Sequence, residues 1–128
     1  MILIIGGAYQ GKRSYAAENF GIAEQAWIDG AVCTREELLD AKAVYDFHKW
    51  VRRQMEDGYP VEQIAKEILE ANPELLIVTD EVGYGIVPMD AKERAWREAC
   101  GRVCTELAAS ARQVIRVCCG IGSTIKSE

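Results

Sequence analysis

The sequence has little histidine, no excess of basic residues and no long apolar run, and each shortage excludes a class of protein. Its 128 residues carry a formal net charge of −5, which gives no general basic surface for nucleic acid. No apolar stretch approaches the roughly 18 residues of a membrane helix. The short apolar start also lacks the basic region that precedes a signal-peptide core. We therefore expect a cytoplasmic protein that forms one domain over residues 1–128 and binds neither nucleic acid nor membrane.

Cysteine is present, but its spacing argues against a metal site. None of the five cysteines forms a C-x-x-C pair, and the single histidine, His48, has no cysteine near it in sequence. Cys100 and Cys104 are one helical turn apart, and Cys118 and Cys119 are neighbours on an expected strand. The simplest interpretation is that all five are reduced thiols that pack as small hydrophobic residues.

The first residues carry the strongest motif of the chain. The apolar run Met1–Ile5 predicts a buried strand, and helical residues up to Phe20 follow a glycine-rich turn. Gly6, Gly11 and Lys12 stand at the G-x-x-x-x-G-K spacing of a phosphate-binding loop. In such a loop, backbone N–H groups and the start of the next helix face a phosphate, and the lysine contacts the β- and γ-phosphates. The residues predicted to bind nucleotide are Gly6, Gly7, Ala8, Tyr9, Gln10, Gly11, Lys12, Arg13 and Ser14.

The loop departs from the usual motif at one position. Arg13 stands where a Ser or Thr normally supplies a hydroxyl to Mg²⁺, and Ser14 follows one place later. Arginine cannot coordinate a cation, but it can hold a phosphate oxygen. We therefore expect nucleotide to bind with a reduced dependence on Mg²⁺. The alternative is a glycine turn that binds nothing.

Strand and helix patterns alternate along the rest of the chain, which predicts an α/β fold with a small, mainly parallel sheet and helices on both faces. Thr34 and Glu37 resemble a capping box at the start of the first helix after the loop region. The predicted strands are Ala26–Asp29, Leu75–Thr79 and Gln113–Cys119, and the predicted helices are 35–55, 60–71 and 90–112. Residues Gly120–Lys126 are expected to form a terminal loop.

Two acidic residues follow the apolar strand Leu75–Thr79, which we expect to lie next to the strand Met1–Ile5. Ligands bind at the carboxyl ends of such strands, so Asp80 and Glu81 should lie near Lys12. The expected strand order is 113–119, 1–5, 75–79, 26–29. Asp80, with Ser14, would hold Mg²⁺, while Glu81 would orient or deprotonate an acceptor hydroxyl and Lys12 would stabilise the transferred phosphate. The alternative is that the two acids only begin a solvated loop.

Other polar and aromatic residues are weaker candidates. Asp29 follows a short strand and is a second possible acid, and Tyr9 is expected to be exposed at the tip of the loop. His48 could be a nucleophile that accepts a phosphoryl or nucleotidyl group, but a partly exposed helix residue is the favoured interpretation. Arg52 and Arg53 are expected on a solvated helix face. Trp50 and Trp96 are expected in the core.

The segment Thr79–Pro88, with the sequence TDEVGYGIVP, resembles the T/S-N-E-V-G-x-G-I-V-P motif of the bifunctional adenosylcobinamide kinase/adenosylcobinamide-phosphate guanylyltransferases. The start of the chain, IIGGA and Gly11-Lys12, is similar to that family's T-G-G-A-R-S-G-K-S. Gly101-Arg102-Val103, Gly120-Ile-Gly and Ile125-Lys126 extend the similarity, which covers about half of the chain.

The resemblance implies a three-layer, RecA-like phosphate-loop fold, ATP or GTP as donor, Mg²⁺, a corrinoid small-molecule substrate and a homo-oligomer. It also implies phosphorylation of a cobinamide hydroxyl, followed by GMP transfer through a guanylylated histidine. The chain is shorter than this family usually is between the first helix and Leu75, where the family carries that histidine, and Asp80 replaces the family's Asn. His48 lacks the family's R-x-x-x-H-R context. The competing hypotheses are a non-catalytic oligomeric module that binds nucleotide or an anion, and a small oligomeric structural protein with an empty loop.

Overall fold

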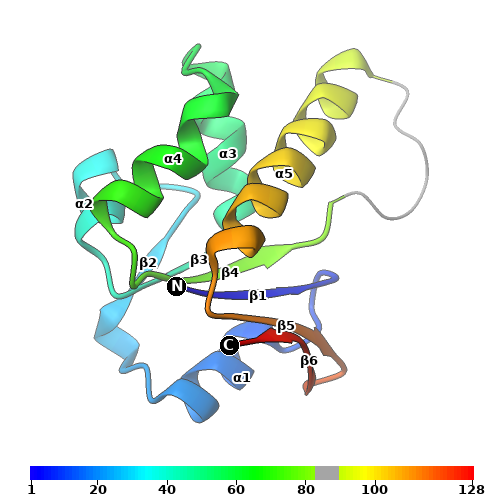
Figure 1. The fold of residues 1–128 in the computed structure, drawn as a ribbon. Helices are drawn as coiled ribbons and strands as arrows, with labels where there is room; N and C mark the ends of the chain where they lie inside the picture. The colour runs from blue at the N-terminus through cyan, green and yellow to red at the C-terminus, as the bar shows by residue number, and fades with distance from the viewer. Residues whose placement is uncertain (83–89) are drawn as a thin grey trace.

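The computed structural model describes residues 1–82 and 90–128 (Figure 1). The part of the TDEVGYGIVP motif that follows Val82, up to Pro88, therefore lies outside the described residues. The strands are β1 (Ile2–Gly6), β2 (Trp27–Asp29), β3 (Ala43–Tyr45), β4 (Leu76–Asp80), β5 (Gln113–Cys118) and β6 (Ile121–Ser127). The helices are α1 (Lys12–Phe20), α2 (Arg35–Asp40), α3 (Phe47–Glu56), α4 (Val61–Ala71) and α5 (Ala91–Ser110), with a short 3₁₀ turn, η1 (Glu24–Ala26).

These strands form one six-stranded sheet in the order β2-β3-β4-β1-β5-β6. Strands β2, β3, β4, β1 and β5 run parallel, and β6 is antiparallel to β5. The sequence correctly predicted that β1 lies between β4 and β5 and that β2 lies beyond β4. Gly6 is aligned with Asp80 in the β1–β4 pair, so the glycine loop and the acidic residue leave the sheet at the same edge.

Helices cover both faces of the sheet, which confirms the predicted α/β architecture (Figure 1). Helices α3, α4 and α5 lie on one face, where Phe47, Val51, Ile68, Val103 and Leu107 belong to the larger apolar core. Helix α1 lies on the other face, over a smaller core that includes Ala16. The central strands are apolar on both sides because both faces are covered.

The long helix predicted over residues 35–55 is wrong. The structure divides this segment into α2, the strand β3 and α3. The apolar spacing of the segment fits a helical stripe, but Ala43 and Val44 are fully buried in the sheet between β2 and β4. Asn72 fixes the break, since its Nδ2 donates to the carbonyls of Leu38 and Ala41 at the end of α2. Tertiary pairing therefore overrides the local periodicity here.

The terminal loop predicted over Gly120–Lys126 is also wrong, because all of it except Gly120 belongs to β6 on the edge of the sheet. Most of β6 is exposed, so the strand lacks the apolar alternation that would have revealed it. Its close fit to α1 explains Gly122: a Cβ there would lie 2.2 Å from the ring of Tyr15.

Helix α5 follows the sequence prediction closely. Asp90 is its N-cap, and the Asp90 carboxylate accepts a hydrogen bond from the backbone N–H of Lys92 at 2.6 Å. Ala99, Cys100, Val103 and Leu107 form its buried stripe, and Trp96 and Ala108 pack partly against the same core. Within residues 1–82 and 90–128, this helix and the shorter ones do not reach the combination of length and apolar character that a bilayer span needs.

Candidate functional site

The loop between β1 and α1 is held in a tight backbone conformation. Gly11, the N-cap of α1, has a φ of 83°, a left-handed conformation that glycine adopts without steric cost. A Cβ on Gly6 would lie 2.4 Å from the carbonyl oxygen of Val117 on β5, so only glycine permits this approach of loop and strand. Tyr9 also has a positive φ and is fully exposed, as predicted for the tip of the loop.

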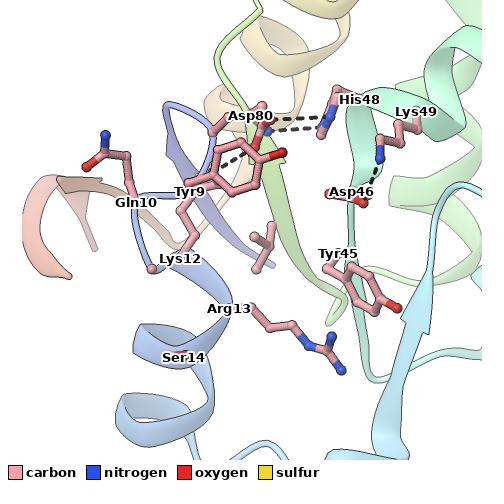
Figure 2. Close-up of a pocket in the computed structure, with 13 residues that line it drawn as sticks. Tyr9, Gln10, Lys12, Arg13, Ser14, Tyr45, Asp46, His48, Lys49 and Asp80 are labelled. Atoms are coloured by element: carbon pink, nitrogen blue, oxygen red, sulfur yellow. Dashed lines mark hydrogen bonds and ion pairs between the residues drawn. The ribbon is translucent and has the colours of Figure 1, made fainter. Parts of the chain in front are cut away.

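Lys12 lies inside the loop and is almost completely buried. Its Nζ donates a hydrogen bond to the carbonyl oxygen of Gly7 at 2.6 Å and forms an ion pair with Asp80 Oδ1 at 2.7 Å (Figure 2). The pairing of β1 with β4 creates this contact, because Lys12 follows the carboxyl end of β1 and Asp80 is the last residue of β4. The sequence prediction that Asp80 lies within reach of Lys12 is therefore confirmed.

Asp80 also contacts His48, which the sequence placed on a partly exposed helix face. His48 is instead 5% exposed, so that expectation is wrong. Its Nδ1 accepts a hydrogen bond from the backbone N–H of Asp80 at 3.2 Å, which leaves the ring proton on Nε2, 3.4 Å from Asp80 Oδ2. Burial lowers the pKa of His48, although the negative charges of Asp80 and Asp46 oppose that effect. A neutral imidazole and an ammonium thus hold the two carboxylate oxygens of Asp80.

A pocket of about 410 Å³ opens between the loop and the segment that joins β3 to α3 (Figure 2). Its second wall consists of Tyr45, Asp46, His48 and Lys49, and Asp80 and Val78 contribute from β4. From the loop come Ala8, Tyr9, Gln10, Gly11, Lys12, Arg13 and Ser14. Gly6 and Gly7 line a neighbouring hollow instead. Seven of the nine residues predicted to bind nucleotide therefore line one pocket.

Sequence reasoning missed Tyr45, Asp46 and Lys49, because the predicted long helix hid the strand β3. The signal that could have revealed this wall was Asp46, an acidic residue between the end of a strand and the start of a helix. Asp46 has a φ of 52°, and its side chain does not cap α3. Its Oδ2 instead lies 3.2 Å from Lys49 Nζ. A non-glycine residue in this conformation carries about 1–3 kcal/mol of strain.

Arg13 points away from the loop, which differs from its expected contact with phosphate. Its guanidinium stacks over the ring of Tyr45 at 4.0 Å and lies 5.5 Å from the ring of Trp27. It also forms an ion pair with Glu24 at 3.1 Å. These contacts attach the first turn of α1 to β2 and β3. Ser14, one residue later, is exposed at the edge of the pocket.

Two of the predicted acids do not line this pocket. Glu81 Oε1 accepts a hydrogen bond from Arg116 Nε at 2.7 Å, and Glu81 borders two other hollows. Asp29 accepts the backbone N–H of Ala31 at 2.9 Å, within its own turn. The structure therefore brings Asp80 to Lys12 but leaves Glu81 and Asp29 outside the pocket.

The turn between β5 and β6 is hydrogen-bonded to the glycine loop. Gln10 accepts two hydrogen bonds there, at Oε1 from the backbone N–H of Cys119 (2.7 Å) and at its carbonyl from Gly120 (2.8 Å). Cys118 and Cys119 are exposed, so the expectation that all cysteines pack as small hydrophobic residues is wrong for these two. Cys33 and Cys100 are buried, as expected.

The helix residues that the sequence assigned to surface or core fall mostly where expected. Trp50 is buried and Trp96 packs partly against the core. Arg52 is exposed and pairs with Glu93 at 3.2 Å. Arg53 differs, because it is only partly exposed and donates to the carbonyls of Gly30 and Cys33, both at 2.8 Å. It has a structural role between α3 and the residues after β2.

The pocket combines the cationic side chains of Lys12, Arg13 and Lys49 with the carboxylates of Asp46 and Asp80. Within the described ranges, His, Cys, Asp and Glu side chains form no cluster of three that could hold a metal ion. Magnesium in nucleotide sites commonly uses one or two carboxylates, with phosphates and waters as its other ligands. Asp80 and Ser14 both line the pocket, and the two carboxylate oxygens of Asp80 contact Lys12 and His48.

The fold and the pocket define an α/β protein with a glycine loop and a lysine at the carboxyl edge of a parallel sheet. Comparison with known proteins identifies the family: residues 25–125 match the model of the cobinamide kinase / cobinamide phosphate guanyltransferase family, and the chain belongs to it. The matched residues begin after α1, so the glycine loop adds an independent observation.

Two curated relatives agree with this assignment. The bifunctional adenosylcobalamin biosynthesis protein CobU of Escherichia coli (strain K12) is 34% identical over 91 residues, which cover 70% of this chain and 50% of the relative. The protein of the same name from Salmonella typhimurium is 48% identical over 52 residues, covering 41% of this chain and 29% of the relative. The chain therefore spans at most about half the length of the curated relatives it matches.

Proposed function

We propose that this protein binds ATP or GTP in the pocket that Lys12 lines. It then transfers the terminal phosphate to the hydroxyl of a corrinoid, in the manner of a cobinamide kinase. The observation that carries the proposal is the 2.7 Å contact between Lys12 and Asp80 at the mouth of the glycine loop. Lys12 stabilises charge on the transferred phosphate, and Asp80, with Ser14, would hold a Mg²⁺ ion that neutralises phosphate charge. The family match supports the cobinamide acceptor.

Guanylyl transfer through His48 is not part of this proposal. Nδ1 of His48 accepts a backbone N–H, Nε2 faces the Asp80 carboxylate, and the ring is almost fully buried. A histidine nucleophile needs one exposed, unprotonated nitrogen. We therefore expect no covalent GMP adduct after incubation with GTP, and an intact-mass increase of one GMP that His48→Ala abolishes would contradict this expectation.

The test of kinase activity uses cobinamide with ATP or GTP and follows the mass of the corrinoid. We expect the product to gain one phosphate and the reaction to stop in Lys12→Ala, because the charge on the transferred phosphate loses its partner. Nucleotide binding is measured in parallel by calorimetry, with Mg²⁺ and with a chelator. Binding without any transfer to cobinamide would contradict the kinase proposal.

A non-catalytic module that binds nucleotide is the second candidate, and the position of Arg13 favours it. Arg13 replaces a hydroxyl that normally completes the Mg²⁺ shell and is committed to Tyr45 and Glu24. This candidate predicts binding that is independent of Mg²⁺ and unaccompanied by turnover. A homo-oligomer, which the family resemblance implies, remains a proposal that light scattering of the purified protein tests.

A further inference from the structure

The pocket contains a second carboxylate, Asp46, which the sequence did not indicate. It follows β3, the strand next to β4, and it lies on the wall opposite the glycine loop (Figure 2). Lys12 lies on the loop side of the pocket, and Asp80 lies between Lys12 and His48, so a phosphate held at Lys12 would face Asp46 across the open space. An acceptor must approach the terminal phosphate from the side away from the leaving group.

Glu81, the acid predicted to serve the acceptor, is badly placed for that role. Its two carboxylate oxygens contact Nε and an Nη of Arg116 on β5, at 2.7 and 3.4 Å. The hollows that Glu81 borders lie beside β5 and α5, and it does not line the pocket that contains Lys12. A group that binds the acceptor has to reach that pocket.

Asp46 is held toward the pocket by its backbone. As the N-cap of α3 it could bond the first turn of the helix, yet its side chain makes no capping hydrogen bond. The left-handed backbone, at φ 52° and ψ 41°, directs the carboxylate to Lys49 and the pocket instead. Strained residues of this kind occur often at functional sites, where the surrounding structure maintains them.

The neighbouring chain maintains this conformation. Gly30 N–H donates to the carbonyl of Tyr45 at 2.8 Å, and Arg53 fixes the Gly30 carbonyl. A Cβ on Gly30 would lie 2.6 Å from the carbonyl oxygen of Asp46, so the glycine makes this close contact possible. The residues after β2 therefore act as a support for the Asp46 backbone.

We propose that Asp46 binds the hydroxyl of the phosphoryl acceptor and takes its proton, an inference that rests on the proposed kinase function. The acceptor is an alcohol that enters from the β3 side of the pocket. Its oxygen forms a bond to the γ-phosphorus while the bond from that phosphorus to the β–γ bridging oxygen breaks. The electron pair leaves with the nucleoside diphosphate, and the hydroxyl proton passes to the Asp46 carboxylate.

The test compares Asp46→Asn with the unmodified protein in transfer from ATP to cobinamide. Asparagine tolerates the left-handed backbone and has nearly the same shape, so the variant should fold and bind nucleotide within about threefold of the unmodified affinity. Loss of a general base should lower kcat by about 100-fold to 1,000-fold. Asp46→Gly, whose glycine suits this φ, is the second variant and should lose turnover similarly.

Two further variants provide the comparison. Asp57→Asn removes the same charge from the exposed end of α3, outside the pocket, and should leave turnover unchanged. Glu81→Gln should reduce kcat less than Asp46→Asn does. If the unmodified protein phosphorylates cobinamide and the kcat of Asp46→Asn is within about threefold of its value, the Asp46 inference alone is overturned. A larger loss of kcat in Glu81→Gln than in Asp46→Asn overturns it as well. An unmodified protein that transfers no phosphate overturns the kinase function, and the Asp46 inference with it.

Discussion

Lys12, Asp80 and His48 form one continuous chain of contacts from the glycine loop into the core. The carboxylate of Asp80 is shared between a buried ammonium and a neutral imidazole, so its orientation is fixed before any ligand binds. A buried charge is tolerated only when it is paired, and Lys12 satisfies this condition through Asp80 and the Gly7 carbonyl. Ligand binding has to be accommodated by this preformed arrangement.

We expect the pKa of His48 to differ between the folded and the unfolded chain. Burial lowers its pKa, while Asp80 and Asp46 act in the opposite direction and Lys49 and Lys12 add to the lowering. The folded pKa therefore lies below the unfolded value of 6.5. As the pH falls below about 6.5, the unfolded chain binds a proton at His48 that the folded protein does not bind. The free energy of unfolding therefore decreases as the pH falls.

The single histidine of the chain makes this measurable without ambiguity. Its imidazole resonances, followed by NMR from pH 8 to pH 5, should titrate below 6.5. Urea unfolding at pH 7.5 and at pH 5.5 should show a smaller loss of stability in His48→Gln than in the unmodified protein. A folded-state pKa above 6.5 would mean that the Asp80 carboxylate dominates over burial.

The short elements around β3 carry much of the architecture. β2 and β3 are three residues each, and they hold their places through contacts with their neighbours rather than through length. Asn72 ties the end of α2 to the end of α4, and Gly30 lies against the backbone that enters α3. The position of the pocket wall therefore depends on packing between elements.

Two glycine substitutions should change the free energy of unfolding in opposite directions. Gly30→Ala places a methyl group 2.6 Å from the Asp46 carbonyl oxygen and should reduce the free energy of unfolding by about 1–3 kcal/mol, as overpacking does. Gly101→Ala, within helix α5, meets no atom within 4 Å and should increase stability by about 0.5–1 kcal/mol. Urea unfolding of both variants provides the measurement. Equal free energies of unfolding for the two variants would show that the backbone around Gly30 and Asp46 moves apart at little cost.

Over the whole molecule, the five thiols differ in their accessibility and acidity. Cys118 and Cys119 are exposed beside the glycine loop, whereas Cys33 and Cys100 are buried and Cys104 is partly covered. Burial is the largest cause that raises the pKa of Cys100 to about 12 and that of Cys104 to about 11, which suppresses their thiolate forms at neutral pH. Contact with Cys119 raises the pKa of Cys118, so its reaction is slowed but not prevented.

Thiol labelling at pH 8 should therefore modify two cysteines in the folded protein and all five in denaturant. Peptide mapping should place the fast labels on Cys118 and Cys119, and Cys118→Ser with Cys119→Ser should leave no fast-reacting thiol. Rapid labelling of Cys100 in the native protein would indicate that α5 separates readily from the core.

The sequence by itself determined the parts of this protein that depend on local chemistry. The glycine spacing, the lysine, the apolar strands β1 and β4 and the caps at Thr34 and Asp90 are local signals, and the structure agrees with each. The alternation of strands and helices also gave the parallel sheet and the adjacency of Lys12 and Asp80, since parallel strands bring their carboxyl ends to one edge.

Only the tertiary structure decided what depends on pairing between distant segments. Residues 43–45 become a strand because β2 and β4 leave a position for them, although their spacing fits a helix equally well. That change turns His48 inward to Asp80, places Asp46 on the pocket wall and gives Arg13 the ring of Tyr45 as a partner. Likewise β6 exists because β5 offers an edge to pair with, and its own exposed residues carry no strand pattern. Side-chain direction in these segments follows from contacts across the sheet, which a local sequence pattern does not encode.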